Sequence, residues 1–380
     1  MRLKTDKIEG FLYNLVFILT FLGVFFVIHD SSFPMYSQTK ILNYILISSL
    51  IIITIILLFI EKLKFKLINS MIIVLLIIST IFSIYKGNFN YYYIYIPIFI
   101  YIGKKKNLIL KKEIKYFVLI STFFSILIQL YNFRFRNITP VLSWRGPNYS
   151  GYFIFIFFLF CMTEKSKLIK TIGYISLFLG FLTLSRTYLV VTILYFLFKM
   201  NLFKKTFLFL KLYNFYTLLI VSLILVFFIG NLFLLLVNNP ANIEYDASRL
   251  LNMNLADGSN YVRFLANNEL IKNLFSNYSI FFQGIDVSVY KELYGLNIPH
   301  NILLKMITIF GGFFTFIYIY IIGYYYNRFR SKGNIPIFVT LFFYFSFLGP
   351  PVWGFPLLLT IFLLKENQKY YMKWSVKNIE

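Results

Sequence analysis

The side chains in this sequence that could do chemistry include a few cations, placed near the ends of apolar segments or in the long polar stretch 238–298. They include Arg145, Arg186, Arg249 and Arg263. A guanidinium group stays charged at any accessible pH, and it can donate two parallel hydrogen bonds to phosphate oxygens. These residues therefore favour a phosphorylated ligand. Two further arginines, Arg134 and Arg136, could equally be anchors that contact lipid head groups.

One histidine has a position that suits acid–base chemistry. His300 follows a proline and precedes Asn301, so the sequence predicts that an extended turn leads into a helix there. A neutral imidazole at that point can take a proton from a hydroxyl group, and Asn301 could orient it or bind substrate. Taken alone, an interfacial histidine can also be a hydrogen-bonded structural residue. That second interpretation is the one we expect for His29.

Two short motifs accompany these residues. In Trp144–Gly151, Gly146 and Pro147 predict a turn just before an apolar segment. Asn148 is of a type that caps helices, so a capped helix start is an alternative to a binding role. The second motif places Ser185 and Arg186 at a tight join between two apolar segments, where a charge has to be paired or used.

The composition shows what must position these residues. Hydrophobic side chains make up 59% of the 380 residues, aromatic ones 22%, and charged ones only 13%, far from the balance of a soluble domain. The sequence therefore predicts a protein whose solvent is lipid. Its one cysteine, Cys161, excludes an internal disulfide framework and a cysteine-based metal site.

Apolar segments long enough to cross a bilayer recur along the whole chain. We expect an all-α polytopic membrane protein with about 12 transmembrane helices, within a range of about 10–13. The expected spans lie near 11–28, 41–60, 67–85, 88–103, 116–132, 149–163, 168–184, 187–200, 212–237, 299–327, 335–349 and 351–364.

The formal charge of +23 is explained by topology, so nucleic acid is not an expected partner. Lysines and arginines gather in alternate connections, which the positive-inside rule assigns to the cytoplasm together with both chain termini. This division predicts transmembrane segments in 1–237, a large extracytoplasmic loop in 238–298, and further transmembrane segments with a cytoplasmic tail in 299–380. Within the loop, Tyr261–Phe275 has the pattern of an amphipathic helix on the membrane surface.

Two classes of function are disfavoured. No acidic residue falls in the middle of an expected span, whereas ion-coupled transporters usually hold such groups near the bilayer midplane. The sequence also has no glycine-rich phosphate loop, which argues against ATP-driven work.

Together the motifs resemble those of the O-antigen polymerase and O-antigen ligase superfamily of bacterial membrane glycosyltransferases. The resemblance covers roughly residues 140–325, and it departs at Gly284-Ile285-Asp286, where many members have a second glycine. The matching residues are Arg145, Gly146, Pro147 and Asn148 before one span, Ser185, Arg186 and Thr187 at another, and Ser259, Arg263, Gly284, His300, Asn301 and Gly311 around the outer loop.

The resemblance implies a GT-C-like fold in the bacterial cytoplasmic membrane, and transfer of a glycan from a polyprenyl-pyrophosphate carrier at the outer face. It implies neither metal nor cofactor, with a chain-length regulator and a flippase as further partners. His300 would be the general base; Arg145, Arg186 and Arg263 would bind the pyrophosphate; the supporting residues would be Asn148, Ser185, Asn301 and Arg249.

Three functions remain open at this point. The favoured one is a polymerase that joins lipid-linked repeat units into O-antigen, capsule or exopolysaccharide. The first alternative is a ligase that moves the glycan to lipid A core or to a protein. The second is a polysaccharide flippase, which would need a cationic cavity inside the bundle, whereas the cations here collect toward one face.

Overall fold

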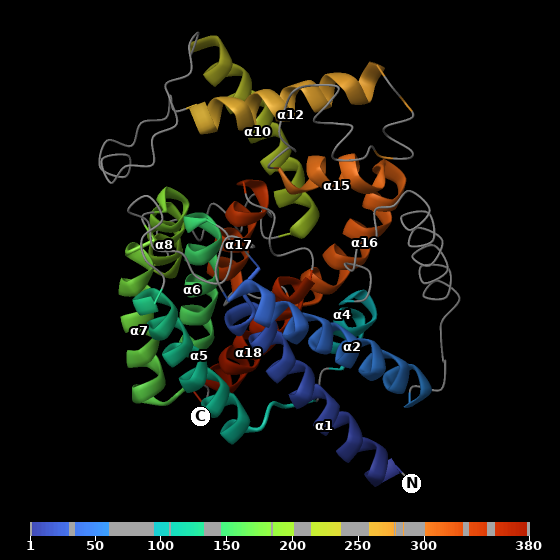
Figure 1. Ribbon diagram of the computed structural model, residues 1–380, viewed down its shortest axis with the longest axis vertical. Helices are drawn as coiled ribbons and strands as arrows, with labels where there is room; N and C mark the ends of the chain where they lie inside the picture. The colour runs from blue at the N-terminus through green and yellow to red at the C-terminus, as the bar shows by residue number, and fades with distance from the viewer. Residues whose placement is uncertain are drawn as a thin grey trace.

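The structure is a computed structural model that describes residues 2–29, 35–60, 95–105, 108–132, 146–183, 185–200, 214–236, 258–276, 278, 284, 301–329, 334–347 and 354–377. Within these ranges the chain is almost entirely helical and contains no strand (Figure 1). The all-α prediction is therefore confirmed for the part of the chain that is described.

The described helices follow the apolar segments of the sequence. The predicted span 67–85 lies outside the described residues. The helices are α1 (Arg2–Phe21), which continues as the π-helix η1 (Leu22–Phe26), α2 (Tyr36–Ile60), α4 (Tyr95–Lys104), α5 (Lys112–Asn132), α6 (Pro147–Met162), α7 (Lys167–Phe181), α8 (Arg186–Lys199), α10 (Phe215–Leu236), α12 (Gly258–Ser276), α15 (Ile302–Phe310), α16 (Gly312–Arg328), α17 (Ile335–Phe347) and α18 (Gly354–Lys377).

Four of these helices are long and apolar enough to cross a bilayer. The qualifying segments are Asp6–Phe26, Tyr36–Leu57, Lys112–Leu130 and Phe215–Leu232. Two shorter apolar helices are Tyr95–Lys104 and Pro147–Met162. The chain is accordingly a helical membrane protein, and the larger number of spans stays a prediction.

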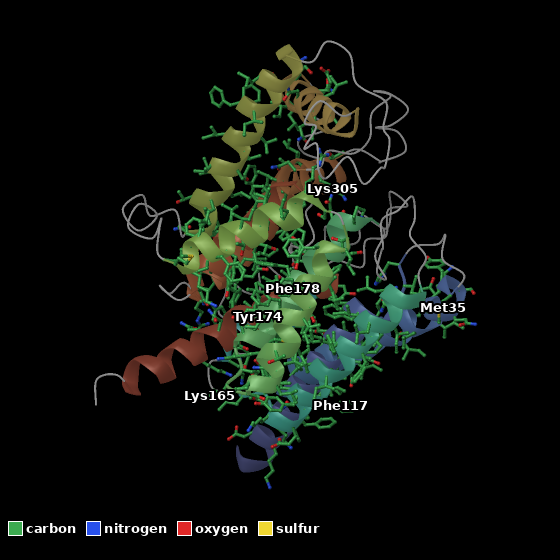
Figure 2. All side chains as sticks on the ribbon, turned by 90° about the vertical axis from the view of Figure 1, so that its left-hand side faces the viewer. Met35, Phe117, Lys165, Tyr174, Phe178 and Lys305 are labelled. Carbon is green, nitrogen blue, oxygen red and sulfur yellow. The ribbon has the colours of Figure 1, made fainter. Side chains whose placement is uncertain are left out.

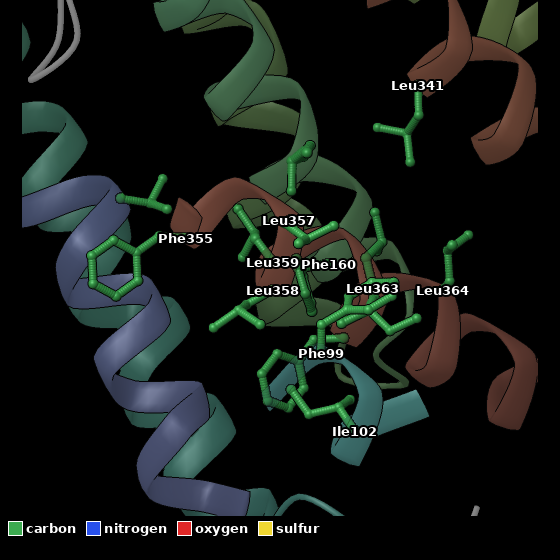
Figure 3. Close-up of a cluster of buried hydrophobic side chains, with 14 of the residues drawn as sticks. Phe99, Ile102, Phe160, Leu341, Phe355, Leu357, Leu358, Leu359, Leu363 and Leu364 are labelled. Atoms are coloured by element: carbon green, nitrogen blue, oxygen red, sulfur yellow. The ribbon is translucent and has the colours of Figure 1, made fainter. Parts of the chain in front are cut away.

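The core is built around α18, whose first half is apolar on every side. The hydrophobic side chains from Phe355 to Leu364 are each at most 3% exposed. Thr360, which lies among them, is fully buried. A helix that is apolar around its whole circumference lies either in a protein core or in lipid. Here α1, α4 and α6 pack around it, and Figure 3 shows Phe99 and Phe160 beside its leucines.

Close contact between η1 and α18 depends on Gly23. A Cβ atom added at Gly23 would lie 2.4 Å from the ring of Phe355, so no larger residue fits without displacing that ring. His29 Nε2 lies 3.1 Å from the carbonyl oxygen of Gly23, in agreement with the structural role expected for this histidine.

The structure corrects one predicted span. Residues 299–327 do not form a single helix, because α15 ends at Phe310 and α16 begins at Gly312. Gly311 has a φ of 79°, a left-handed conformation that glycine adopts without a steric penalty. The chain can therefore turn at this point, and α15 packs against α16.

The molecule has two distinct ends (Figure 1). Both chain termini lie toward the lower end in this view, whereas α12 lies across the upper end. Figure 2 shows Lys165 at the lower end and Lys305, on α15, near the upper end. The helix predicted over Tyr261–Phe275 is confirmed as α12, and it packs on α10 and α15. Its position on a membrane surface stays a prediction.

Candidate functional site

The structure brings two of the sequence motifs into contact. Ser185 Oγ donates a hydrogen bond of 2.6 Å to Asn148 Oδ1, although the two residues are 37 positions apart. Ser185 is only 4% exposed, and its hydroxyl oxygen also accepts from the backbone nitrogen of Tyr188 at 3.1 Å. One serine hydroxyl therefore fixes the start of α8 and joins it to the start of α6.

Arg186 follows this joint as the first residue of α8 and is partly exposed. The N-terminus of a helix is the positive end of its dipole, so the backbone adds to the charge of the guanidinium group. The structure thus places a cation, a serine hydroxyl and an amide at the meeting point of two helix starts. That combination is suited to an anionic ligand with several oxygen atoms.

Two details of the motifs differ from the sequence interpretation. Gly146, with a φ of 93°, is the residue at the N-cap of α6, and Asn148 turns to Ser185 instead of capping that helix. The capped-start alternative therefore does not describe Asn148. Arg186, which the sequence analysis placed at the join before the expected span 187–200, is already the first residue of α8, and α7 ends at Phe181.

Asn301 has a structural task that the sequence analysis did not assign. Its side-chain oxygen accepts from the backbone nitrogens of Leu303 at 3.0 Å and Leu304 at 3.3 Å, which caps α15. It is 1% exposed, and its backbone nitrogen donates to Asn267 Oδ1 of α12 at 3.5 Å. Asn301 therefore connects α15 to the helix above it.

The remaining site predictions can be placed only in part. Arg263 lies on α12, but its side chain is not described. Arg145, Arg249 and His300 lie outside the described residues. Of the eight predicted positions, the structure therefore brings together Asn148, Ser185 and Arg186, and it sets Asn301 beneath α12.

Several polar residues at the upper end were missed. Asn231 of α10 and Asn267 and Asn268 of α12 meet between helices, and Lys305 is a cation within the otherwise uncharged α15. The signal was present, because Asn231 and Lys305 both interrupt apolar segments, where a polar or charged side chain has to face protein or water. The sequence analysis considered polar residues in loops and at span ends, and it therefore did not identify Asn231 and Lys305.

A buried cluster of charges at the lower end was also missed. Lys115 of α5 forms ion pairs with Glu366 of α18, at 2.8 Å, and with Glu164 after α6. Lys115 is 5% exposed and Glu366 9%. Lys369 pairs with Glu366 at 3.1 Å and donates to the carbonyl oxygen of Leu108 at 2.7 Å. These four side chains, Lys115, Glu164, Glu366 and Lys369, form what we call the ion cluster.

The charges of the cluster set the protonation of its central carboxylate. Burial on its own would raise the pKa of Glu366, but the positive charges of Lys115 and Lys369, with their hydrogen bonds, bring it below its ordinary value. Two lysines and two glutamates balance in charge. The ion cluster is therefore a neutral clamp between α5, α18 and the connection that follows α6.

Lys365 lies next to this clamp without belonging to it. It directly follows the predicted span 351–364 and is 2% exposed, with Nζ 4.3 Å from the ring centroid of Tyr13. Its Nζ has no hydrogen-bond partner among the described residues. Burial lowers the pKa of Lys365 to about 7, helped by Lys369 and opposed by Glu366. Among the described residues, Lys365 is thus a buried lysine whose pKa lies near neutrality.

Comparison with known proteins adds no relative to this picture, because no protein-family model, no curated protein and no solved structure matches the chain.

Proposed function

We propose that this protein is a membrane glycosyltransferase that polymerises polyprenyl-pyrophosphate-linked oligosaccharide repeat units into a surface polysaccharide. The proposal takes its chemistry from the motifs of the sequence. It takes its support from the described contact between two of those motifs, at the starts of α6 and α8.

The observation that carries the proposal is the joint of Asn148, Ser185 and Arg186. A tight join between two apolar helices would normally be apolar, and a cation there has to be paired or used. The N-terminus of α8 and the guanidinium group of Arg186 both favour negative charge. A pyrophosphate group is an anion with oxygens enough for both. Under the proposal, Arg186 binds the leaving group.

The reaction needs only a base and a stabilised leaving group. A hydroxyl oxygen of the acceptor sugar attacks the anomeric carbon of the donor, and His300 takes the hydroxyl proton. The bond between that carbon and the pyrophosphate oxygen breaks, and the polyprenyl pyrophosphate leaves with the electron pair. Arg145, Arg186 and Arg263 compensate its charge in the proposed site.

The finer topology belongs to the same proposal. It comprises about 12 spans, a GT-C-like arrangement, a bacterial cytoplasmic membrane, and both termini in the cytoplasm. In this orientation the joint of Asn148 and Ser185 faces outward with α12, where lipid-linked repeat units would be joined.

Arg186→Lys tests the role of the guanidinium group. The variant keeps the positive charge but loses the planar pair of donors, so we expect the rate of chain extension to fall by about tenfold or more. The assay mixes purified protein with lipid-linked repeat units, extracted from host cells that lack this protein, and measures the length of the polysaccharide formed. Lys170→Arg, on α7 at the other end, is the matched control and should extend chains at the wild-type rate. A wild-type rate for Arg186→Lys would contradict the proposal.

His300→Ala tests the base. The acceptor that the wild-type protein uses separates polymerase from ligase. The variant should insert into the membrane normally and form no polymer, since no other group would accept the proton. Polysaccharide of normal length from His300→Ala would remove the histidine from the mechanism. If the wild-type protein transfers a finished glycan to lipid A core or protein but does not extend chains, the ligase alternative is correct.

A further inference from the structure

Four asparagines lie where α12 meets the helices below it. They are Asn231 on α10, Asn267 and Asn268 on α12, and Asn301 at the start of α15, and we call them the amide layer. Asn267, Asn268 and Asn301 are 4%, 5% and 1% exposed. The layer lies at the upper end, beneath the helix that crosses it in Figure 1.

Two hydrogen bonds of the amide layer follow one another, each running from an amide nitrogen to the next oxygen. Asn231 Nδ2 donates to the carbonyl oxygen of Phe227 at 3.0 Å, and Asn268 Nδ2 donates to Asn231 Oδ1 at 2.8 Å. The series ends at Asn268 Oδ1, which is buried and has no hydrogen-bond partner among the described residues. Asn273 Nδ2, further along α12, is a buried donor in the same condition.

An open acceptor at this depth needs an explanation, since buried polar groups in folded proteins almost always have a partner. If packing were the only requirement, leucine would be the more stable choice at this position. Leucines do fill the neighbouring contact, where Leu270 of α12 packs against Leu304 of α15. The missing partner of Asn268 Oδ1 must be a donor. A phosphate oxygen only accepts, so the lipid pyrophosphate cannot supply it.

A sugar fits this requirement. Its hydroxyl groups both donate and accept, as amides do, and the layer has no charge of its own with which to attract an anion. Resting on the proposed function, we propose that the amide layer binds the saccharide part of the lipid-linked substrate, with Asn268 Oδ1 accepting a hydrogen bond from a sugar hydroxyl. The amides then recognise the glycan, while the arginines hold its pyrophosphate.

The test compares two ligands on one variant. The wild-type protein and Asn268→Leu are each titrated in detergent with two ligands. One is undecaprenyl pyrophosphate, and the other is the lipid-linked repeat unit extracted from host cells that lack this protein. We expect the wild type to bind the sugar-bearing lipid more tightly. Asn268→Leu should reduce that preference by about fivefold to tenfold, the value of a hydrogen bond or two, and should bind the bare lipid as the wild type does. Binding of the bare lipid also reports that the variant is folded.

Lys272→Met, on the exposed side of α12, is the matched control, since its side chain is 71% exposed. It should keep the wild-type preference. An unchanged preference in Asn268→Leu would overturn the inference, and it would mean that the open acceptor is met by water. A wild-type protein that binds neither lipid would overturn the proposed function itself, and the inference with it.

Discussion

The two ends of this molecule hold their helices together by different chemistry. At the lower end, four charged side chains form the ion cluster, in which Lys115 joins Glu164 and Glu366. At the upper end and at the starts of α6 and α8, the contacts are between neutral groups, as in Asn268 with Asn231 and Ser185 with Asn148. Both sets are largely buried.

The difference shows which end can exchange partners. Removing one member of a buried ion cluster leaves an uncompensated charge, so such a cluster stays closed. A neutral hydrogen bond can be replaced by one to a ligand hydroxyl at little net cost. The lower end is therefore built as a clamp, and under our proposal the neutral contacts of the upper end open to a ligand. Three substitutions test this contrast.

Lys115→Met should have the largest effect, because it leaves the carboxylates of Glu164 and Glu366 buried near one another without the lysine that pairs with both. We expect a loss of about 3–5 kcal/mol in the free energy of unfolding, measured by thermal or denaturant unfolding in detergent. Lys112→Met is the control, because Lys112 is exposed one turn earlier on α5. Equal stability of the two variants would show that the ion cluster is not a clamp.

Lys365→Met should change stability in the opposite direction and by a smaller amount, because it removes a buried amine that has no hydrogen-bond partner within the described ranges. The pKa of Lys365 is about 7 in the folded protein and 10.5 in an ordinary lysine. Between these pH values the unfolded chain holds the proton and the folded chain does not, so stability rises with pH across that window.

The measurement for Lys365 is the thermal midpoint of both proteins from pH 6 to pH 10. The variant should be more stable than the wild type near pH 6, and the difference should shrink as the pH rises. A difference that stays constant with pH would contradict a titrating lysine at this position. Other groups titrate equally in both proteins and cancel in the comparison.

Ser185→Ala should have the smallest effect on stability. It removes both the cap of α8 and the bond to Asn148, and we expect a loss of about 1–2 kcal/mol. Ser166→Ala is the matched control, because Ser166 caps α7 through the backbone nitrogen of Ile169. The difference between the two variants isolates the contact with Asn148. A larger loss in Ser166→Ala would show that this contact adds nothing to the upper end.

Much of the fold could be predicted because hydropathy is a local property of the chain. Runs of apolar residues predicted α2, α5 and α10 within a few residues, and the pattern of Tyr261–Phe275 predicted α12. The break at Gly311 was missed, since a glycine within an apolar run looks the same whether the helix bends or continues. The predicted span 67–85 lies outside the described residues.

The site was predicted as a set of residue types and not as an arrangement. Asn148, Ser185 and Arg186 were identified from their motifs, but nothing in the sequence indicated that Ser185 would donate to Asn148. Asn268 was overlooked, because an asparagine in a polar loop is ordinary until another helix buries it.

By itself, the sequence determined that this protein is helical and lies in a membrane, because composition and hydropathy follow from residues counted one at a time. Tertiary structure alone decided which polar groups are buried, which of them meet, and which are left open. Residue type and neighbouring sequence do not distinguish Lys115 and Asn268 from other lysines and asparagines of the chain. Their roles arise only when distant helices exclude water around them and their hydrogen bonds must be made within the protein.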